Sequence, residues 1–299
     1  MKYEYLLERC QLCPRECSVN RNEAKGFCGE GRSVRIARAE KHMWEEPCIS
    51  GENGSGAVFF SGCNLKCCYC QNFEISHLSK GFKLSDLELA QTFLRLKTMG
   101  AENINLVNPT HFVPQILNAL ELVKGKLNIP IVYNSGGYEK SDTLELLKDY
   151  VQIFLPDLKY FDPTASKKYS SAKDYFEHAF ASISKMVEIA GKPSFENGRL
   201  KSGVLVRHMV LPNMRRDSIK LIEILSESFE KDEILVSLMS QYTPVYKAGD
   251  FDELNRCVST FEYNCVVKEL EKSGFDGYIQ QRESSSEDFI PKFYDEKYY

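Results

Sequence analysis

Three cysteines lie close together at Cys63, Cys67 and Cys70, just after an apolar run that ends at Phe60. Three thiolates with this spacing on one short loop can bind three irons of a 4Fe–4S cluster. The fourth iron then has no protein ligand and can bind a small molecule. A zinc site with Cys68 or a histidine as its fourth ligand is the alternative, but structural zinc sites normally use paired cysteines and four protein ligands. The spacing therefore favours an iron–sulfur cluster.

A second group of cysteines lies near the N-terminus in the pattern Cys-x2-Cys-x3-Cys-x10-Cys, formed by Cys10, Cys13, Cys17 and Cys28. Four thiolates can complete the coordination of a structural zinc ion or hold a second 4Fe–4S cluster. Zinc would only stabilise this segment, whereas a cluster would indicate an electron relay. Four reduced thiols without metal are the third reading. The residues leave the identity of the metal open.

The composition limits the functional class. The chain has 299 residues, a net charge of −4 and a hydrophobic fraction of 43%, which is enough for a large core. The acidic balance argues against a nucleic-acid partner. We find neither a signal peptide nor an apolar stretch of the length that spans a membrane. Eleven cysteines without a secretion signal indicate a reducing compartment, so we expect a cytoplasmic protein without membrane contact.

The chain divides into three segments by pattern. Residues 1–50 are cysteine-rich and irregular, and we expect a metal-stapled cap. Residues 51–280 alternate between strands and helices, which predicts an α/β fold with a parallel sheet in a full or partial barrel. Residues 281–299 are polar, and form either a mobile tail or a strap over the site. The expected strands are 57–60, 103–107, 130–134, 151–155, 204–211, 234–239 and 277–279; the expected helices are 85–99, 113–123, 141–150, 172–189, 217–228 and 258–272, and 194–201 is expected to be a loop.

The cysteine loop also carries a family resemblance. Cys-x3-Cys-x2-Cys, with Tyr69 just before the third cysteine and Asn72 two residues after it, resembles radical S-adenosylmethionine (SAM) enzymes. It is most similar to the pyruvate formate-lyase activating enzymes and to their homologues with an extra N-terminal cysteine segment. The likeness covers roughly residues 50–245. It implies a partial (β/α)6 barrel of the TIM type, with the cluster on the loop after the first barrel strand.

The resemblance implies a radical reaction. SAM binds the open iron, and one electron cleaves it to give a 5′-deoxyadenosyl radical that abstracts hydrogen from a substrate. The implied partners are SAM, an electron donor such as flavodoxin or ferredoxin and, in the close form of the resemblance, a glycyl radical enzyme whose glycine is the substrate. A small-molecule or peptide substrate is one alternative. A non-catalytic iron–sulfur electron-transfer or metal-binding protein is the alternative from another class.

Ligands of parallel barrels collect at the carboxyl ends of the strands, so polar residues there are candidates for SAM contacts. The family usually has Gly-Gly-Glu-Pro after its second strand, where this chain has Asn108 before a proline and Thr110 after it. The third strand ends like the family's Thr-Asn-Gly turn, and the fourth like its Asp-x-Lys element. Each candidate could instead serve a turn or a structural ion pair, and no catalytic residue is assigned. The candidates are Tyr69, Asn108, Thr110, Asn134, Ser135, Gly136, Asp157, Lys159, Arg207 and Gln241.

Overall fold

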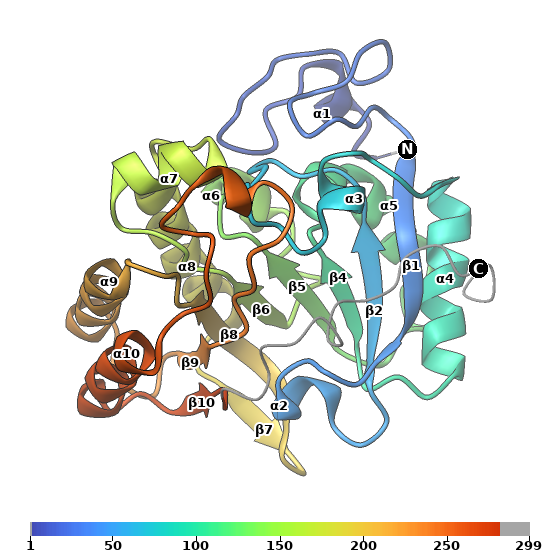
Figure 1. Ribbon diagram of the computed structural model, residues 1–299. Coiled ribbons are helices and arrows are strands. Elements are labelled where there is room, and N and C mark those ends of the chain that lie inside the picture. The colour runs from blue at the N-terminus through green and yellow to red at the C-terminus, as the bar shows by residue number, and fades with distance from the viewer. Residues whose placement is uncertain (1, 282–299) are drawn as a thin grey trace.

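A single mixed sheet forms the centre of the molecule (Figure 1). The computed structural model describes residues 2–281. The sheet order is β10-β9-β8-β6-β5-β4-β2-β1-β3, with β7 paired to β8 outside this path. The strands are β1 Val34–His42, β2 Ser55–Phe60, β3 Phe82–Leu84, β4 Ile104–Val107, β5 Ile131–Ser135, β6 Ile153–Pro156, β7 Ser194–Glu196, β8 Arg199–Met209, β9 Leu235–Met239 and β10 Gly277–Ile279.

The strands from β2 to β10 along this path run parallel to one another. β1 and β3 extend the sheet beyond β2 in antiparallel pairing. All residues of β2 are buried, as expected for an inner strand covered on both faces. This open parallel sheet is the α/β partial barrel that the strand–helix alternation predicts. The carboxyl ends of its parallel strands therefore share one end of the barrel.

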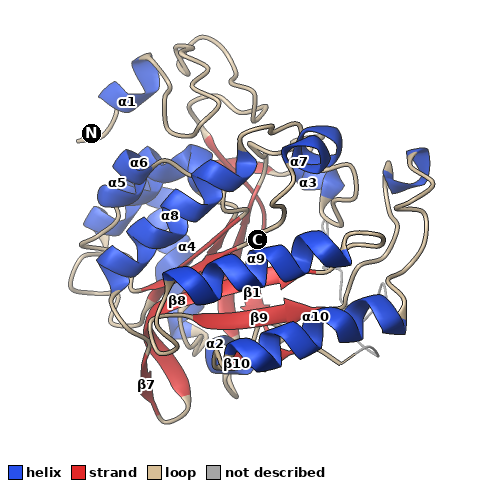
Figure 2. Cartoon of the chain, turned by 90° about the vertical axis from the view of Figure 1, so that its left-hand side faces the viewer, coloured by secondary structure: helices blue, strands red, loops and turns tan. Residues whose placement is uncertain are grey.

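Helices cover the outer face of the sheet, and Figure 2 shows α8, α9 and α10 as a layer in front of the strands. A capping box begins α4, because the Ser85 hydroxyl accepts from the Glu88 amide while the Glu88 carboxylate accepts from the Ser85 amide. No helix among residues 2–281 is long and apolar enough to cross a membrane. The helices are α1 Tyr5–Glu8, α2 Pro47–Ser50, α3 Phe73–Ser76, α4 Asp86–Thr98, α5 Val113–Leu122, α6 Ser141–Glu145, α7 Pro163–Ser170, α8 Tyr175–Ala190, α9 Arg215–Ser228 and α10 Thr260–Ser273.

Several segments differ from the prediction. The segment 194–201 is not a loop, because β7 and the start of β8 form a hairpin around Asn197 and Gly198, whose positive φ angles of 51° and 74° suit a two-residue turn. The segment 1–50 is not irregular throughout, since β1 lies within it. A β-bulge between Ile36 and Arg38 breaks the alternation of apolar and polar residues that would have indicated this strand.

Two helical segments also differ. The helix expected over 141–150 spans only α6, and the one expected over 172–189 begins at Tyr175, after the unpredicted helix α7. The division of the chain at residue 50 stays a prediction. The predicted tail 281–299 lies outside the described residues except for Gln281.

Candidate active site

The loop after β2 carries Cys63, Cys67 and Cys70 at the carboxyl end of the parallel strands. Gly62 begins this loop with a φ of +82°, and a Cβ there would lie 2.8 Å from the carbonyl oxygen of Cys28. The position therefore needs glycine both for its backbone conformation and for the close approach of the N-terminal segment. The side-chain amide of Asn108 donates to the Gly62 carbonyl at 2.5 Å, which holds the loop against the end of β4.

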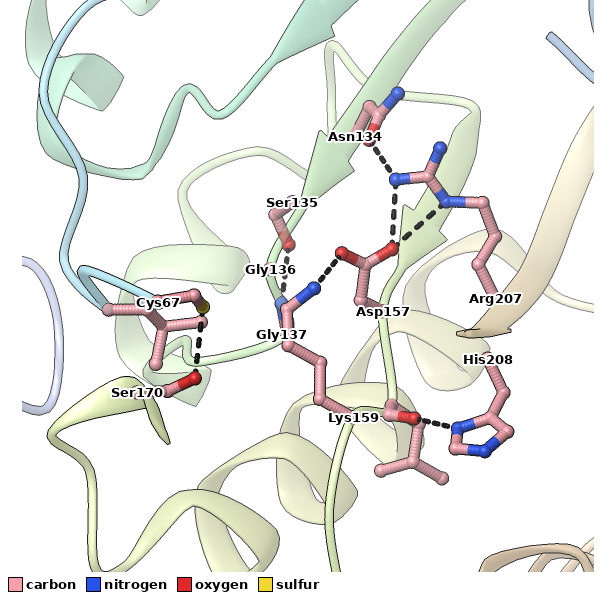
Figure 3. A network of polar contacts seen from close by, with 12 residues as sticks. Cys67, Asn134, Ser135, Gly136, Gly137, Asp157, Lys159, Ser170, Arg207 and His208 are labelled. Atoms are coloured by element: carbon pink, nitrogen blue, oxygen red, sulfur yellow. Dashed lines mark hydrogen bonds and ion pairs between the residues drawn. The ribbon is translucent and has the colours of Figure 1, made fainter. Parts of the chain in front are cut away.

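Each of the three thiols has a hydrogen-bond partner. The amide of Leu65 donates to Cys63 Sγ at 3.3 Å, and the hydroxyl of Ser170 donates to Cys67 Sγ at 2.9 Å (Figure 3). Cys70 Sγ lies 3.2 Å from the hydroxyl oxygen of Ser76. Donors of this kind to cysteine sulfurs tune the reduction potential of an iron–sulfur cluster. The loop thus supplies the three thiols and the Leu65 donor, whereas Ser76 comes from the end of α3 and Ser170 from the end of α7.

Burial changes the acid–base state of these thiols. It raises the pKa of the Cys70 thiol to about 12, and it also raises the pKa of Cys67. In the absence of a metal, both side chains are therefore neutral near pH 7. A metal site displaces such protons, because the thiolate is the ligand.

No three His, Cys, Asp or Glu side chains in residues 2–281 converge on the position of a single metal ion. A 4Fe–4S cluster needs no such convergence, because it distributes its cysteine ligands over separate iron atoms. Three thiols with hydrogen-bond donors are a donor set that fits such a cluster.

A cavity of about 840 Å³ extends from the three thiols into the barrel. Its volume lies within the roughly 300–1,000 Å³ that is common for small-molecule sites. The ends of β4, β5, β6, β8 and β9 line it, together with the segment between β1 and α2. The sequence-predicted residues that line it are Cys63, Cys67, Cys70, Tyr69, Asn108, Asn134, Ser135, Gly136, Asp157, Lys159, Arg207 and Gln241.

A network of charged groups lies on the wall of this cavity (Figure 3). Asp157 Oδ2 lies 2.5 Å from Lys159 Nζ, and Asp157 Oδ1 lies 2.9 Å from Arg207 Nη2. Arg207 Nη2 also donates to Asn134 Oδ1 at 2.5 Å. Burial alone would raise the pKa of Asp157, but the charges of Lys159 and Arg207 outweigh it and hold that pKa below its usual value. Asp157 is therefore ionised at neutral pH, between two cations.

The polar groups of three other predicted residues bond to neighbouring side chains of the protein. The Tyr69 hydroxyl makes a short hydrogen bond to the Tyr160 hydroxyl, which in turn lies 2.8 Å from Ser170 Oγ. Gln241 accepts from the Gln280 side chain at 3.3 Å. Thr110 does not line the cavity; it is fully buried and donates to Glu139 Oε1 at 2.6 Å.

Sequence reasoning missed Glu45, which also lines the cavity. Its side chain is 10% exposed, accepts from the Asn105 amide at 3.0 Å and lies 3.5 Å from Arg207 Nη1. Burial raises its pKa, although Arg207 acts in the opposite direction. Ser76 and Ser170, the partners of two thiols, were missed as well. None of these residues belongs to a spaced motif or directly ends a predicted barrel strand, so the sequence offers no signal for them.

The N-terminal cysteines gather in one loop that lies across the carboxyl end of the barrel (Figure 1). Cys10, Cys13 and Cys28 are buried, and Cys17 is partly exposed. A Cβ at Gly26 would lie 3.6 Å from both Cys17 Sγ and Cys28 Sγ, so these two thiols flank that glycine. None of the four thiols lines the cavity.

Comparisons with known proteins agree with this geometry. The sequence pattern of the family described as "Radical SAM superfamily" matches residues 57–225, which is more than half of the chain. The chain belongs to the radical SAM superfamily. The predicted resemblance to this superfamily is therefore confirmed. The chain is a radical SAM enzyme, and the superfamily implies SAM and a 4Fe–4S cluster as its cofactors.

Individual relatives support the same assignment. An uncharacterised protein of Methanocaldococcus jannaschii is 29% identical over 281 residues, which are 91% of this chain and 77% of that protein. The pyruvate formate-lyase-activating enzyme of Clostridium pasteurianum is 25% identical over 202 residues, covering 62% of this chain and 76% of the enzyme. The structure of HydG, a maturase of the [FeFe]-hydrogenase, superimposes with a TM-score of 0.50 at 13% identity. This match covers 76% of the chain and about half of HydG, and supports the fold.

Proposed function

We propose that this enzyme reductively cleaves SAM and that the resulting 5′-deoxyadenosyl radical abstracts hydrogen from a second substrate. Cys63, Cys67 and Cys70 would bind the 4Fe–4S cluster that supplies the electron. The observation that carries this proposal is the position of three hydrogen-bonded thiols on the wall of a cavity that also presents a carboxylate between two cations. Such an arrangement suits a ligand that has an ammonium and a carboxylate group.

The charged network has a defined role in this proposal. Lys159 presents its ammonium to the carboxylate of SAM, and Asp157 keeps Lys159 charged, because its carboxylate raises the pKa of that side chain against the effect of burial. Arg207 holds Asp157 and Asn134 in place with donors from one planar group. Asn108, Gln241 and the turn Asn134–Gly136 offer neutral hydrogen-bonding groups around the rest of the molecule.

The second substrate is proposed from the relatives. The likeness to the pyruvate formate-lyase-activating enzyme of C. pasteurianum supports a partner enzyme as the substrate, and we propose a glycine of that partner as the hydrogen donor. We propose a flavodoxin or ferredoxin as the reductant. A small molecule or a peptide is the alternative substrate, since Glu45 and Met239 also line the cavity and are not among the proposed SAM contacts. We also propose that the four N-terminal cysteines bind a metal.

The test is SAM cleavage by the anaerobically reconstituted, dithionite-reduced protein. We expect 5′-deoxyadenosine from the wild type and none above background from Cys70→Ser, which removes one of three ligands. Cys68→Ser is the matched control, because this residue lies on the same loop but outside the three-cysteine spacing, and it should keep full activity. Product from Cys70→Ser, or none from an iron-loaded wild type, would contradict the proposal.

A further inference from the structure

A direct hydrogen bond joins the two cysteine regions. The backbone amide of Cys63 donates to the backbone carbonyl of Cys28 at 3.2 Å. One cysteine of each group is therefore bonded directly to one cysteine of the other. The path from one sulfur to the other consists of the covalent bonds of two cysteines and this single hydrogen bond. Such a short bonded path is suited to electron transfer between metal groups held by the two residues.

A lysine lies beside both groups. The Lys66 ammonium donates to the Ser76 carbonyl at 2.6 Å, and a Cβ at Gly29, the residue after Cys28, would lie 3.7 Å from it. A fixed cation beside cysteine ligands favours the reduced state of an iron–sulfur cluster, because reduction adds negative charge. A single lysine thus acts on both regions.

The N-terminal loop is built around its thiols. The sulfurs of Cys17 and Cys28 both lie next to Gly26, since a Cβ there would be 3.6 Å from each of them. The amide of Phe27 donates to Cys17 Sγ at 3.3 Å, and the guanidinium of Arg21 lies 3.8 Å from Cys10 Sγ. Hydrogen bonds to cysteine sulfurs help to set the reduction potential of an iron–sulfur cluster.

The loop is fixed rigidly to the barrel. Arg21 is 1% exposed and donates to the carbonyls of Gly31 and His111, at 2.6 Å and 2.7 Å. The hydroxyl of Thr143 donates to the Leu12 carbonyl at 2.8 Å. These bonds connect the loop to the segments that follow β4 and β5, two neighbouring strands on the same side of β2. The separation between the two regions is therefore set by the fold.

We propose that Cys10, Cys13, Cys17 and Cys28 hold a second 4Fe–4S cluster that relays electrons to the barrel site through Cys28 and Cys63. This inference rests on the proposed function. A protein donor of the flavodoxin or ferredoxin class loses one electron, which reduces the second cluster by one electron. The same electron then passes to the barrel site, where it is consumed in breaking the bond between sulfur and C5′ of SAM. No proton or further co-reactant is needed for the relay.

Metal content provides the first test. We expect about eight irons per chain in the reconstituted wild type and about four in both Cys17→Ala and Cys70→Ser. Each variant should keep the electron paramagnetic resonance signal of its remaining reduced cluster, and the wild type should show the broadening that results from two clusters interacting. Cys257→Ser, at an exposed cysteine outside both groups, should match the wild type. One zinc with four irons, or four irons alone, would overturn the proposal.

The reductant separates a relay from a structural role. With reduced flavodoxin as donor, Cys17→Ala should cleave SAM at least tenfold more slowly than the wild type, whereas with dithionite the two should agree within about threefold. Equal losses with both donors would overturn the relay. A wild type with eight irons that does not cleave SAM would refute the proposed function and leave the second cluster standing.

Discussion

The two cysteine regions use the same ligand atoms in different surroundings. Cys63, Cys67 and Cys70 lie on the wall of a large cavity, whereas Cys10 and Cys28 lie in a closed loop that has no part in that cavity. The barrel loop has three thiols at the fixed spacing, and the N-terminal loop has four. Ligand number and access together decide what a bound metal group can do. A three-thiol site open to a cavity can bind a substrate, while a closed four-thiol site can only exchange electrons or stabilise the fold.

The largest effect on SAM binding should come from Lys159, the lysine on the cavity wall. Lys159→Met removes the ammonium beside Asp157, which keeps Arg207 as its partner, so the fold should persist. A charge-assisted hydrogen bond contributes about 1.5–3 kcal/mol, so the dissociation constant for SAM should rise about 10- to 150-fold. Equilibrium dialysis with the reconstituted protein measures this constant.

The control for this variant is Lys140→Met, which removes a lysine paired with Glu16 at the same distance of 2.5 Å but outside the cavity. SAM binding should not change in that variant, and iron content should be that of the wild type in both. Unaltered SAM affinity in Lys159→Met would show that the open region does not use its charges to bind SAM.

Glu139, which follows β5, is a buried acid that bonds to hydroxyls rather than to a cation. Glu139 accepts from Thr110 Oγ1 at 2.6 Å and from the Tyr133 hydroxyl at 3.1 Å, and burial raises its pKa from 4.5 to about 7. The folded state therefore binds a proton that the unfolded state releases above pH 4.5. The free energy of unfolding should fall as the pH rises from 4.5 to 7, by about 3 kcal/mol, and level off above that range.

Glu139→Gln tests this dependence, since its amide can still bond to both hydroxyls but cannot ionise. Between pH 4.5 and pH 8 the wild type should lose about 3 kcal/mol of unfolding free energy relative to Glu139→Gln, because only the wild type ionises at this position. Urea denaturation at both pH values measures this difference. Parallel curves for the two proteins would show that Glu139 does not titrate in this range. Asp157, whose pKa is lowered by two cations, shows the opposite arrangement on the cavity side.

The sequence predicted the parts of the site that follow a periodic or spaced pattern. The strand–helix alternation indicated the partial barrel, and the rule that ligands meet at the carboxyl ends of parallel strands brought Asp157, Lys159 and Arg207 together correctly. The same rule predicted that Thr110 contacts SAM, but Thr110 does not line the cavity. The chain turns at Asn108, which has a φ of +58°, and the Thr110 hydroxyl bonds to Glu139 instead.

The remaining site residues depend on tertiary packing. Ser170 reaches Cys67 from the end of α7, which lies 103 residues further along the chain and was not predicted. Glu45 follows a strand that a β-bulge concealed. The hairpin at Asn197–Gly198 had a recognisable turn signal, which the polar composition of its exposed strands obscured. Contacts between segments so far apart leave no local pattern in a single sequence.

The smallest effect should come from Arg15, which holds the N-terminal cysteine loop to the cysteine loop of the barrel. Arg15 Nε donates to the Asn64 carbonyl at 2.8 Å and Arg15 Nη1 to the Ser171 carbonyl at 2.5 Å, and the guanidinium lies 4.0 Å from the ring centroid of Phe27. Arg15→Met leaves these carbonyls without their donors and should lower the free energy of unfolding by about 1–2 kcal/mol. Urea denaturation of the metal-loaded protein measures this loss.

The free energy of unfolding of Arg15→Lys should lie between those of the wild type and Arg15→Met. A lysine keeps the charge but cannot donate to the Asn64 and Ser171 carbonyls at the same time as a guanidinium does. Limited proteolysis within residues 20–26 should become faster in Arg15→Met, since the N-terminal loop is then held mainly by Arg21 and Thr143. SAM affinity should stay at the wild-type value, because Arg15 does not line the cavity. A change in SAM affinity without a change in proteolysis would mean that the two regions are coupled through the barrel loop itself and not through the docking of one on the other.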